Sequence, residues 1–109
     1  MSKPDTTAPD SSTTESRKYV SFDHSWTDPW TGDEVSVAYR FAKPTPAQIK
    51  RMQATASKNA PAAARNLILD VIHAEDREAF QRESENYPGL VTTMAGALIK
   101  SVGLADLGN

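Results

Sequence analysis

Two short segments near the start of the chain alternate strictly between apolar and polar residues. The apolar side of residues 17–27 holds Val20, Phe22, His24 and Trp26, and that of residues 34–42 holds Val35, Val37, Tyr39 and Phe41. A period of two with one apolar face is typical of a half-buried antiparallel strand. The connecting residues 27–33, TDPWTGD, contain an Asp-Pro turn opener and Gly32, which accepts a positive φ. The pattern predicts a hairpin whose apolar face needs a cover, because isolated hairpins are unstable.

From residue 45 onward the apolar positions recur at helical spacing. Thr45, Pro46 and Gln48 match an N-cap, a first-turn proline and a capping-box partner. The first predicted helix has its apolar face at Ile49, Met52 and Ala56. Pro61 opens a second helix, whose stripe is the strongest apolar face in the chain. That stripe consists of Ala64, Leu67, Ile68, Val71 and Ile72.

A third helical segment, rich in charge, covers about residues 76–86. The sequence leaves open whether it continues the second helix or restarts with Asp76 as its cap. Pro88-Gly89 ends it, and a last helix begins at Leu90 or Val91. The apolar face of the last helix holds Leu90, Val91, Met94, Ala95, Leu98 and Val102, and Gly103 is its expected stop. These elements predict an α+β domain, an N-terminal β-hairpin followed by a bundle of three or four helices.

The first 16 residues differ in composition from the rest of the chain. MSKPDTTAPDSSTTES has no aromatic and no β-branched aliphatic residue, which predicts a disordered tail over residues 1–16. This segment also lacks the apolar region of a signal peptide. We expect a single folded domain over residues 17–105 and a flexible C-terminus at residues 106–109.

Composition narrows the classes of partner and compartment. The absence of cysteine excludes disulfides and thiolate metal sites, and it suits a reducing cytosol. The longest uncharged run, residues 86–99, is too short and too polar to span a bilayer, so we expect no membrane partner. A formal net charge of −2 provides no global attraction for nucleic acid.

Charge is unevenly distributed along the chain. Six cations and no acid occupy the segment from Arg40 to Arg65, namely Arg40, Lys43, Lys50, Arg51, Lys58 and Arg65. Residues 70–86 then contain six acids against two arginines. A basic stripe suits phosphate, so a small nucleic-acid-binding module is an alternative hypothesis. The acidic balance of the whole chain makes nucleic acid an unlikely partner. The acids either neutralise the stripe within the fold or meet a second copy, which favours protein assembly.

Catalytic and metal-binding motifs are not found in the sequence. Neither a nucleophile elbow nor a Gly-rich phosphate loop is present. His24 is interpreted as a structural residue on the apolar strand face, and His73 as a helix-end residue near a C-terminal dipole. Asp70 and His73 make at best a weak metal pair, and the turn acids match no known cation loop. We therefore expect no enzyme activity, no metal and no cofactor.

Trp30 is the aromatic residue whose position the pattern does not fix. It lies in the predicted turn, where burial is not required. Folding back onto the hairpin is the favoured interpretation, and exposure for a partner is the alternative. A stacking platform with Trp26 and Tyr39, beside Arg40 and Lys43, is a weaker hypothesis, because Trp26 and Tyr39 belong to the predicted core face.

Four sequence blocks, in this order, carry a resemblance to a known group of proteins: YRFAKPTPAQIKR, AAARNLILDVI, EDREAF and YPGLVTTMAGALIKSVG. Over about residues 37–103 the chain resembles small proteins from the tail-gene clusters of tailed bacteriophages and prophages, usually treated as tail assembly chaperones. The resemblance implies a non-enzymatic protein that binds the long helical tape measure protein, the tail tube protein, or both, during tail assembly. Some such proteins also have a longer form made by ribosomal frameshifting.

The residues proposed for partner binding combine the turn, the basic stripe and the last helix. They are Trp30, Arg40, Lys43, Lys50, Arg51, Ala95 and Gly96. Gly96, with alanines on both sides, permits a close approach of another helix. Packing of these small residues inside the same monomer is the favoured alternative. A homo-oligomer is also compatible with the two-ended charge.

Overall fold

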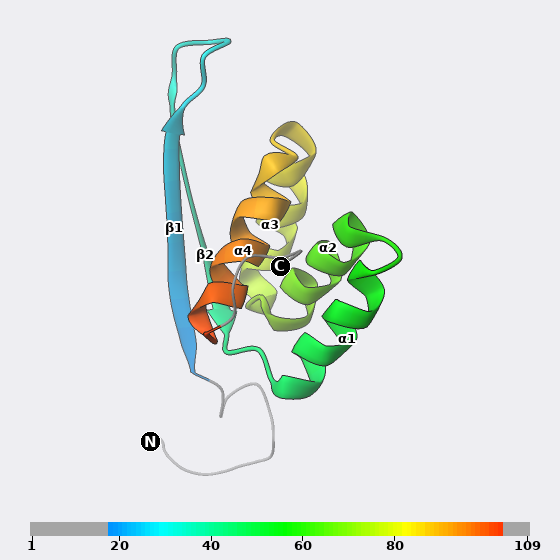
Figure 1. The fold of residues 1–109 in the computed structure, drawn as a ribbon. Helices are drawn as coiled ribbons and strands as arrows, with labels where there is room; N and C mark the ends of the chain where they lie inside the picture. Colours follow the sequence, from blue (N-terminus) through cyan, green and yellow to red (C-terminus); the bar gives the residue numbers. More distant parts are fainter. Residues whose placement is uncertain (1–17, 104–109) are drawn as a thin grey trace, which may run out of the picture.

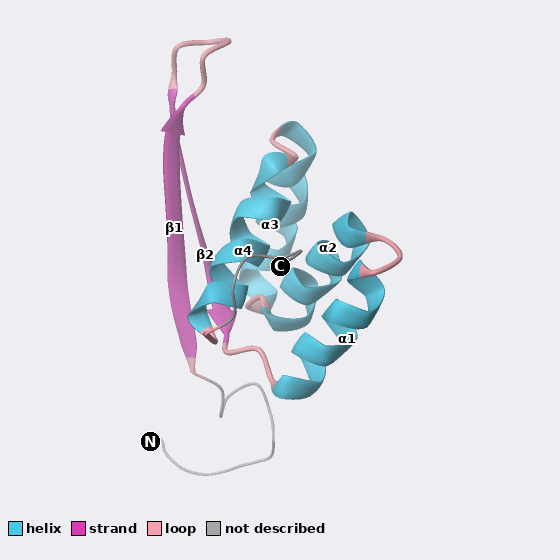
Figure 2. Ribbon diagram, viewed as in Figure 1, coloured by secondary structure: helices cyan, strands magenta, loops and turns pink. Residues whose placement is uncertain are grey.

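The computed structural model describes residues 18–103 (Figure 1). The predicted disordered tail at residues 1–16 and the flexible C-terminus at residues 106–109 lie outside the described residues. Within the described range the chain is a two-stranded antiparallel hairpin followed by four helices, which confirms the predicted α+β class (Figure 2). None of the helices in this range is long and apolar enough to cross a membrane.

The hairpin consists of β1 (Tyr19–Thr27) and β2 (Glu34–Ala42). Their register is unbroken from Tyr19 opposite Ala42 to Thr27 opposite Glu34. The turn closes with two backbone hydrogen bonds, from the Asp28 amide to the Asp33 carbonyl at 2.8 Å and from the Gly32 amide to the Asp28 carbonyl at 2.7 Å. Gly32 has the predicted positive φ, 81°, a conformation that side chains with a Cβ rarely adopt.

The helices are α1 (Pro46–Ala56), α2 (Ala60–Val71), α3 (Ala74–Asn86) and α4 (Gly89–Ser101). The capping box predicted for the first helix is present, with Thr45 and Gln48 bonding each other's backbone amides. Asn59 caps α2 by accepting from the Ala62 amide at 3.1 Å. Gly103 has a φ of 91° and follows α4, as expected for a helix stop.

The junction between α2 and α3 resolves a question that the sequence leaves open. The third helix is separate from the second, and its cap is His73 rather than Asp76. The His73 Nδ1 atom accepts from the Glu75 amide at 3.1 Å, so His73 caps the N-terminus of α3 and also directly follows the C-cap of α2, the helix end at which the sequence places it. Asp76 is unavailable as a cap because its carboxylate binds Arg40 of β2.

The hairpin forms one layer and the helices the other, with the tip of the hairpin reaching beyond the helices (Figure 1). The core lies between β2, α2, α3 and α4. Its largest fully buried side chains are Tyr39, Phe41, Phe80, Leu67, Ile68, Met94, Leu98, Ile99 and Val71. The predicted stripe of α2 is buried throughout. The last helix also buries Ile99, which the predicted face did not include.

Strand β2 is fastened to the helices by its backbone as well as its side chains. The His73 amide donates to the Arg40 carbonyl at 2.8 Å, and Phe41 forms an isolated antiparallel bridge with Ile72. Both the Arg40 amide and its guanidinium donate to Asp76, with distances of 2.8 to 3.0 Å. The guanidinium hydrogen bonds hold the pKa of Asp76 below its ordinary value. The hydroxyl of Tyr39 donates to Glu83 of α3.

Candidate binding groove at the hairpin tip

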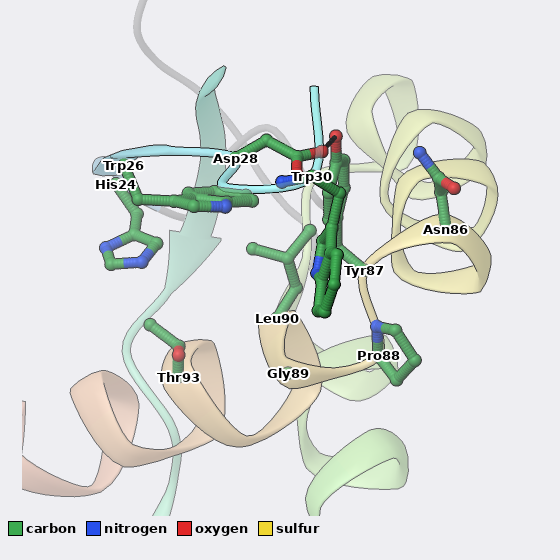
Figure 3. A pocket seen from close by; sticks show the side chains of 10 residues that line it. All are labelled: His24, Trp26, Asp28, Trp30, Asn86, Tyr87, Pro88, Gly89, Leu90 and Thr93. Carbon is green, nitrogen blue, oxygen red and sulfur yellow. Dashed lines mark hydrogen bonds between the residues drawn. The ribbon is translucent and has the colours of Figure 1, made fainter. Parts of the chain in front are cut away.

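A groove of about 600 Å³ lies between the hairpin tip and the junction of α3 with α4 (Figure 3). Its lining comes from β1, the turn, the end of α3 and the first turns of α4. The lining residues are His24, Trp26, Asp28, Trp30, Asn86, Tyr87, Pro88, Gly89, Leu90 and Thr93. The hairpin therefore forms one wall of this groove, and two helix ends form the other.

Asp28 connects the two walls. Its carboxylate accepts a hydrogen bond from the Trp30 amide at 2.8 Å and another from the Tyr87 hydroxyl at 2.9 Å, the latter drawn in Figure 3. The Trp30 amide, followed by the Tyr87 hydroxyl, lowers the pKa of Asp28. The same bond to Asp28 raises the pKa of Tyr87. Asp28 is thus an ionised acceptor that orders the turn, which accounts for a buried acid in a loop.

Trp30 is held at its backbone while its side chain remains exposed. Its amide is bonded to Asp28, but 92 % of the residue surface is accessible to solvent. The favoured interpretation, that Trp30 folds back onto the hairpin, is therefore wrong, and the alternative of an exposed turn tryptophan is what the structure has. Tryptophan combines a large apolar ring with few rotamers, so an exposed tryptophan beside a groove is a candidate contact for a partner.

The wall beneath Trp30 is built from packed rings. Trp26 meets Tyr87 edge-to-face with 5.0 Å between the ring centroids, and His24 stacks on Trp26 at 5.2 Å. Leu90 of α4 is buried, and Figure 3 shows its side chain between Trp26 and Tyr87. His24 is thus a half-buried packing residue, as predicted. The described residues contain no group of three or more His, Cys, Asp and Glu placed to hold a metal.

A second concavity of about 390 Å³ lies at the other end of β1. It is lined by Lys18, Val20, Phe22, Phe41, Ala42, Lys43, Pro44, Leu98 and Ser101. Val20 is 51 % exposed there and, with Trp30, is one of the two large apolar residues exposed in the described range. The apolar face of β1 is thus open at both ends of the strand.

Two cations of the predicted basic stripe form ion pairs within the fold. Arg40 binds Asp76 and Glu75, and Arg51 binds Asp70 at 2.6 Å. Lys43 and Lys50 are exposed and make no ion pair within residues 18–103. Three of the six acids in residues 70–86 therefore neutralise cations of the stripe within the fold.

The small residues of α4 divide between the core and the surface. Ala95 is completely buried, so in this conformation it packs inside the monomer, as the favoured alternative held. Gly96 is partly exposed, and a Cβ added there would meet no atom within 4 Å. Gly96 is therefore the member of this pair that a partner can reach.

The Asp28–Tyr87 contact is the feature of the site that sequence reasoning missed. The two residues are 59 positions apart, and no spacing rule relates them. In the sequence Tyr87 stands out only as the first residue of the block YPGLVTTMAGALIKSVG. The polar turn residues around Trp30 indicate that Asp28 accepts hydrogen bonds, but they do not identify Tyr87 as a donor to it.

Comparisons with other proteins give the fold and the family. No curated protein matches this chain. The solved structure of the uncharacterised protein RBSTP2171 from Bacillus stearothermophilus is similar, with a TM-score of 0.65 and 22 % sequence identity. The match covers 83 % of this chain and 88 % of that one, and at this identity it shows a shared fold alone. Residues 25–109 match the family described as Domain of unknown function (DUF6848), and the chain belongs to that family.

Proposed function

We propose that this protein is a tail assembly chaperone of a bacteriophage or prophage, acting without catalysis in the cytoplasm of the host cell. Its client is the tape measure protein, with the tail tube protein as a second candidate. The proposal starts from the resemblance of residues 37–103 to proteins of tail-gene clusters. The surface at the hairpin tip supplies a physical means of binding for such a role.

The single observation that carries the proposal is the exposed indole of Trp30 beside the groove. Tryptophan is prominent among residues that dominate binding energies, because its large ring buries much apolar surface with few rotamers to fix. The Trp30 amide is already ordered by Asp28 at 2.8 Å, which reduces the entropy lost on binding. A tryptophan with a fixed backbone and an exposed ring suits capture of an apolar side chain.

A helical client fits this groove better than a small molecule does. Apolar side chains spaced three or four residues apart on a client helix would contact Trp26 and Trp30 along the groove. The polar groups that line the groove include Asp28, whose carboxylate is already bonded to Trp30 and Tyr87. A long helical tape measure protein supplies many such apolar stripes, which need a cover until the tube surrounds them.

Co-expression of the full-length chain with an affinity-tagged tape measure protein from the same gene cluster tests the proposal. We expect the wild-type chain to co-purify and to keep the tape measure protein soluble. Trp30→Ala should abolish most of this recovery without changing the fold. Val20→Ala is the matched control, because Val20 is also an exposed apolar residue but lies at the other end of β1.

Two outcomes would contradict the proposal: no recovery of the wild-type chain with either the tape measure or the tail tube protein, or equal recovery of Trp30→Ala and wild type. The nucleic-acid alternative has a separate test. Since Arg40 and Arg51, two of the six cations of the stripe, pair with acids and the whole chain has a net charge of −2, we expect no affinity for DNA or RNA even at low salt. Binding that weakens steeply as salt is added would favour that alternative instead.

A further inference from the structure

The two outer edges of the hairpin differ in how they are covered. On β2, the amide and carbonyl of Arg40 bond to Asp76 and His73, and Phe41 bridges to Ile72. Within the described residues, no backbone hydrogen bond reaches β1 from any segment other than β2. Among residues 18–103, therefore, nothing covers the outer edge of β1 along its nine residues.

The hydrogen-bond pattern identifies which backbone groups point outward from β1. The Asp28 amide donates to Asp33, and antiparallel pairs alternate between bonded and non-bonded, so Thr27 and Glu34 form a non-bonded pair. The contacts of Arg40 agree with this alternation, because its amide and carbonyl bond to Asp76 and His73 and so point away from its partner Ser21. The outward-pointing residues of β1 are consequently Tyr19, Ser21, Asp23, Ser25 and Thr27.

This edge has little of the usual protection against pairing. Proteins commonly guard open edges with proline, bulges, short strands or charged side chains, and the one charged residue of β1 is Asp23, on the face away from the helices. The β1 register has no bulge, the strand has no proline, and the face toward the helices holds Val20, Phe22, His24 and Trp26. Val20 is half exposed at this edge, so a neighbouring strand would remove apolar surface from water as well as bond the backbone.

We propose that β1 pairs with β1 of a second copy of this chain, in antiparallel orientation about a two-fold axis. This orientation places Lys18, at the base of one hairpin, toward the tip of the other, which carries Asp33 and Glu34. Opposite charges thus approach at both ends of the interface. A helical client would not supply such a strand, so the second copy is the occupant that the edge fits.

The register of the pair follows from the sequence of the strand. A two-fold axis makes one residue face its own copy, and centring on Asp23 would oppose two like charges. Centring on Phe22 instead places the two Phe22 rings together and Asp23 opposite Ser21. The result is a four-stranded sheet with both helical layers on the same face. The paired segment then covers residues 18–26, which leaves both Trp30 side chains open, so this proposal does not depend on the proposed function.

Ser25 and Ser36 provide a matched pair of variants. They are exposed and directly opposite in the register, and the amide of each points to the outer edge of its own strand. Proline is tolerated at such edge positions but removes the outward donor. By light scattering after size exclusion, we expect the wild-type chain to have a mass of twice 11.9 kDa. Ser25→Pro should weaken self-association at least about tenfold. Ser36→Pro should self-associate as strongly as wild type.

Amide hydrogen exchange of the wild-type chain tests the same interface without any substitution. The outward amides of Ser21, Asp23 and Ser25 should be protected in concentrated protein and should lose protection on dilution. The outward amides of Ser36 and Ala38 should exchange quickly at both concentrations. A wild-type chain that is monomeric at the concentrations of this experiment, or a dimer whose β1 outward amides exchange as fast as those of β2, would overturn the proposal.

Discussion

The two strands of the hairpin have the same length and the same alternating pattern, yet they end in different environments. Tyr39 and Phe41 of β2 are each 1 % exposed, whereas Val20 of β1 is 51 % exposed and Phe22 is half-buried. The difference arises because the helices pack against β2, and β1 reaches them chiefly through its neighbour. Phe22 meets Phe41 edge-to-face at 5.4 Å between ring centroids, and Trp26 meets Tyr87.

The comparison separates structural from functional roles within one hairpin. Strand β2 is part of the core and is fixed by Arg40 to α3. Strand β1 is supported by β2, which leaves its outer edge, its half-open apolar face and the adjacent turn free to meet other chains. Because β1 contributes less to the core, an interaction surface on β1 lowers the stability of the fold less than one on β2 would.

The largest expected effect is the loss of stability on truncating a ring of β2. Phe41→Ala should lower the free energy of unfolding by about 3–5 kcal/mol, as for a buried phenylalanine. Phe22→Ala on β1 should cost about 2 kcal/mol or less, since only part of its ring is withdrawn from water. Urea unfolding of dilute protein measures both. Equal losses would show that β1 belongs to the core as much as β2 does.

Asp76→Asn should have the next largest effect, because it weakens the connection of β2 to α3. Hydrogen bonds to a charged group suggest a loss of about 2 kcal/mol at neutral pH. The folded-state pKa of Asp76 lies below the unfolded value, so its contribution is present above pH ~4 and is lost as pH falls through the folded-state pKa. The stability of Asp76→Asn should accordingly fall less than that of wild type on acidification. Identical pH profiles would contradict the assignment.

Gly96→Ala should change stability by less and in the opposite direction. Alanine favours a helix interior over glycine by about 1 kcal/mol, and the added Cβ meets no atom within 4 Å. We expect a higher melting temperature by calorimetry. If a client approaches α4 at Gly96, the same variant should also recover less tape measure protein. Unchanged recovery would show that the client-binding surface lies on the hairpin and its tip and does not include Gly96.

The smallest effect on global stability is expected for Tyr87→Phe, which removes only the hydroxyl donor to Asp28. The turn should loosen while the core stays intact, because the edge-to-face contact of ring 87 with Trp26 is kept. Amide exchange of Trp30 should accelerate, whereas exchange in α2 should not change. Faster exchange in both regions would show that the tip and the core unfold together.

Local patterns determined most of the secondary structure. The period of two in residues 17–27 and 34–42 reflects side chains alternating across a pleated strand, and Thr45 with Gln48 closes a capping box within a single turn. Such signals involve residues only a few positions apart, so they can be recognised in the sequence without knowledge of the tertiary structure. The buried stripe of α2 was predictable for the same reason, since helical spacing alone places it on one face.

Contacts between distant segments decided the rest. The Arg40–Asp76 and Asp28–Tyr87 pairs join residues 36 and 59 positions apart, and they connect β2 to α3 and the turn to the junction of α3 with α4. No local pattern distinguishes β1 from β2, because alternation states that one face is apolar but not how fully another layer will cover it. The sequence by itself determined the elements and their apolar faces, and only tertiary packing chose which faces were covered. Helix propensity and pleating act over a few residues, whereas burial depends on the whole chain.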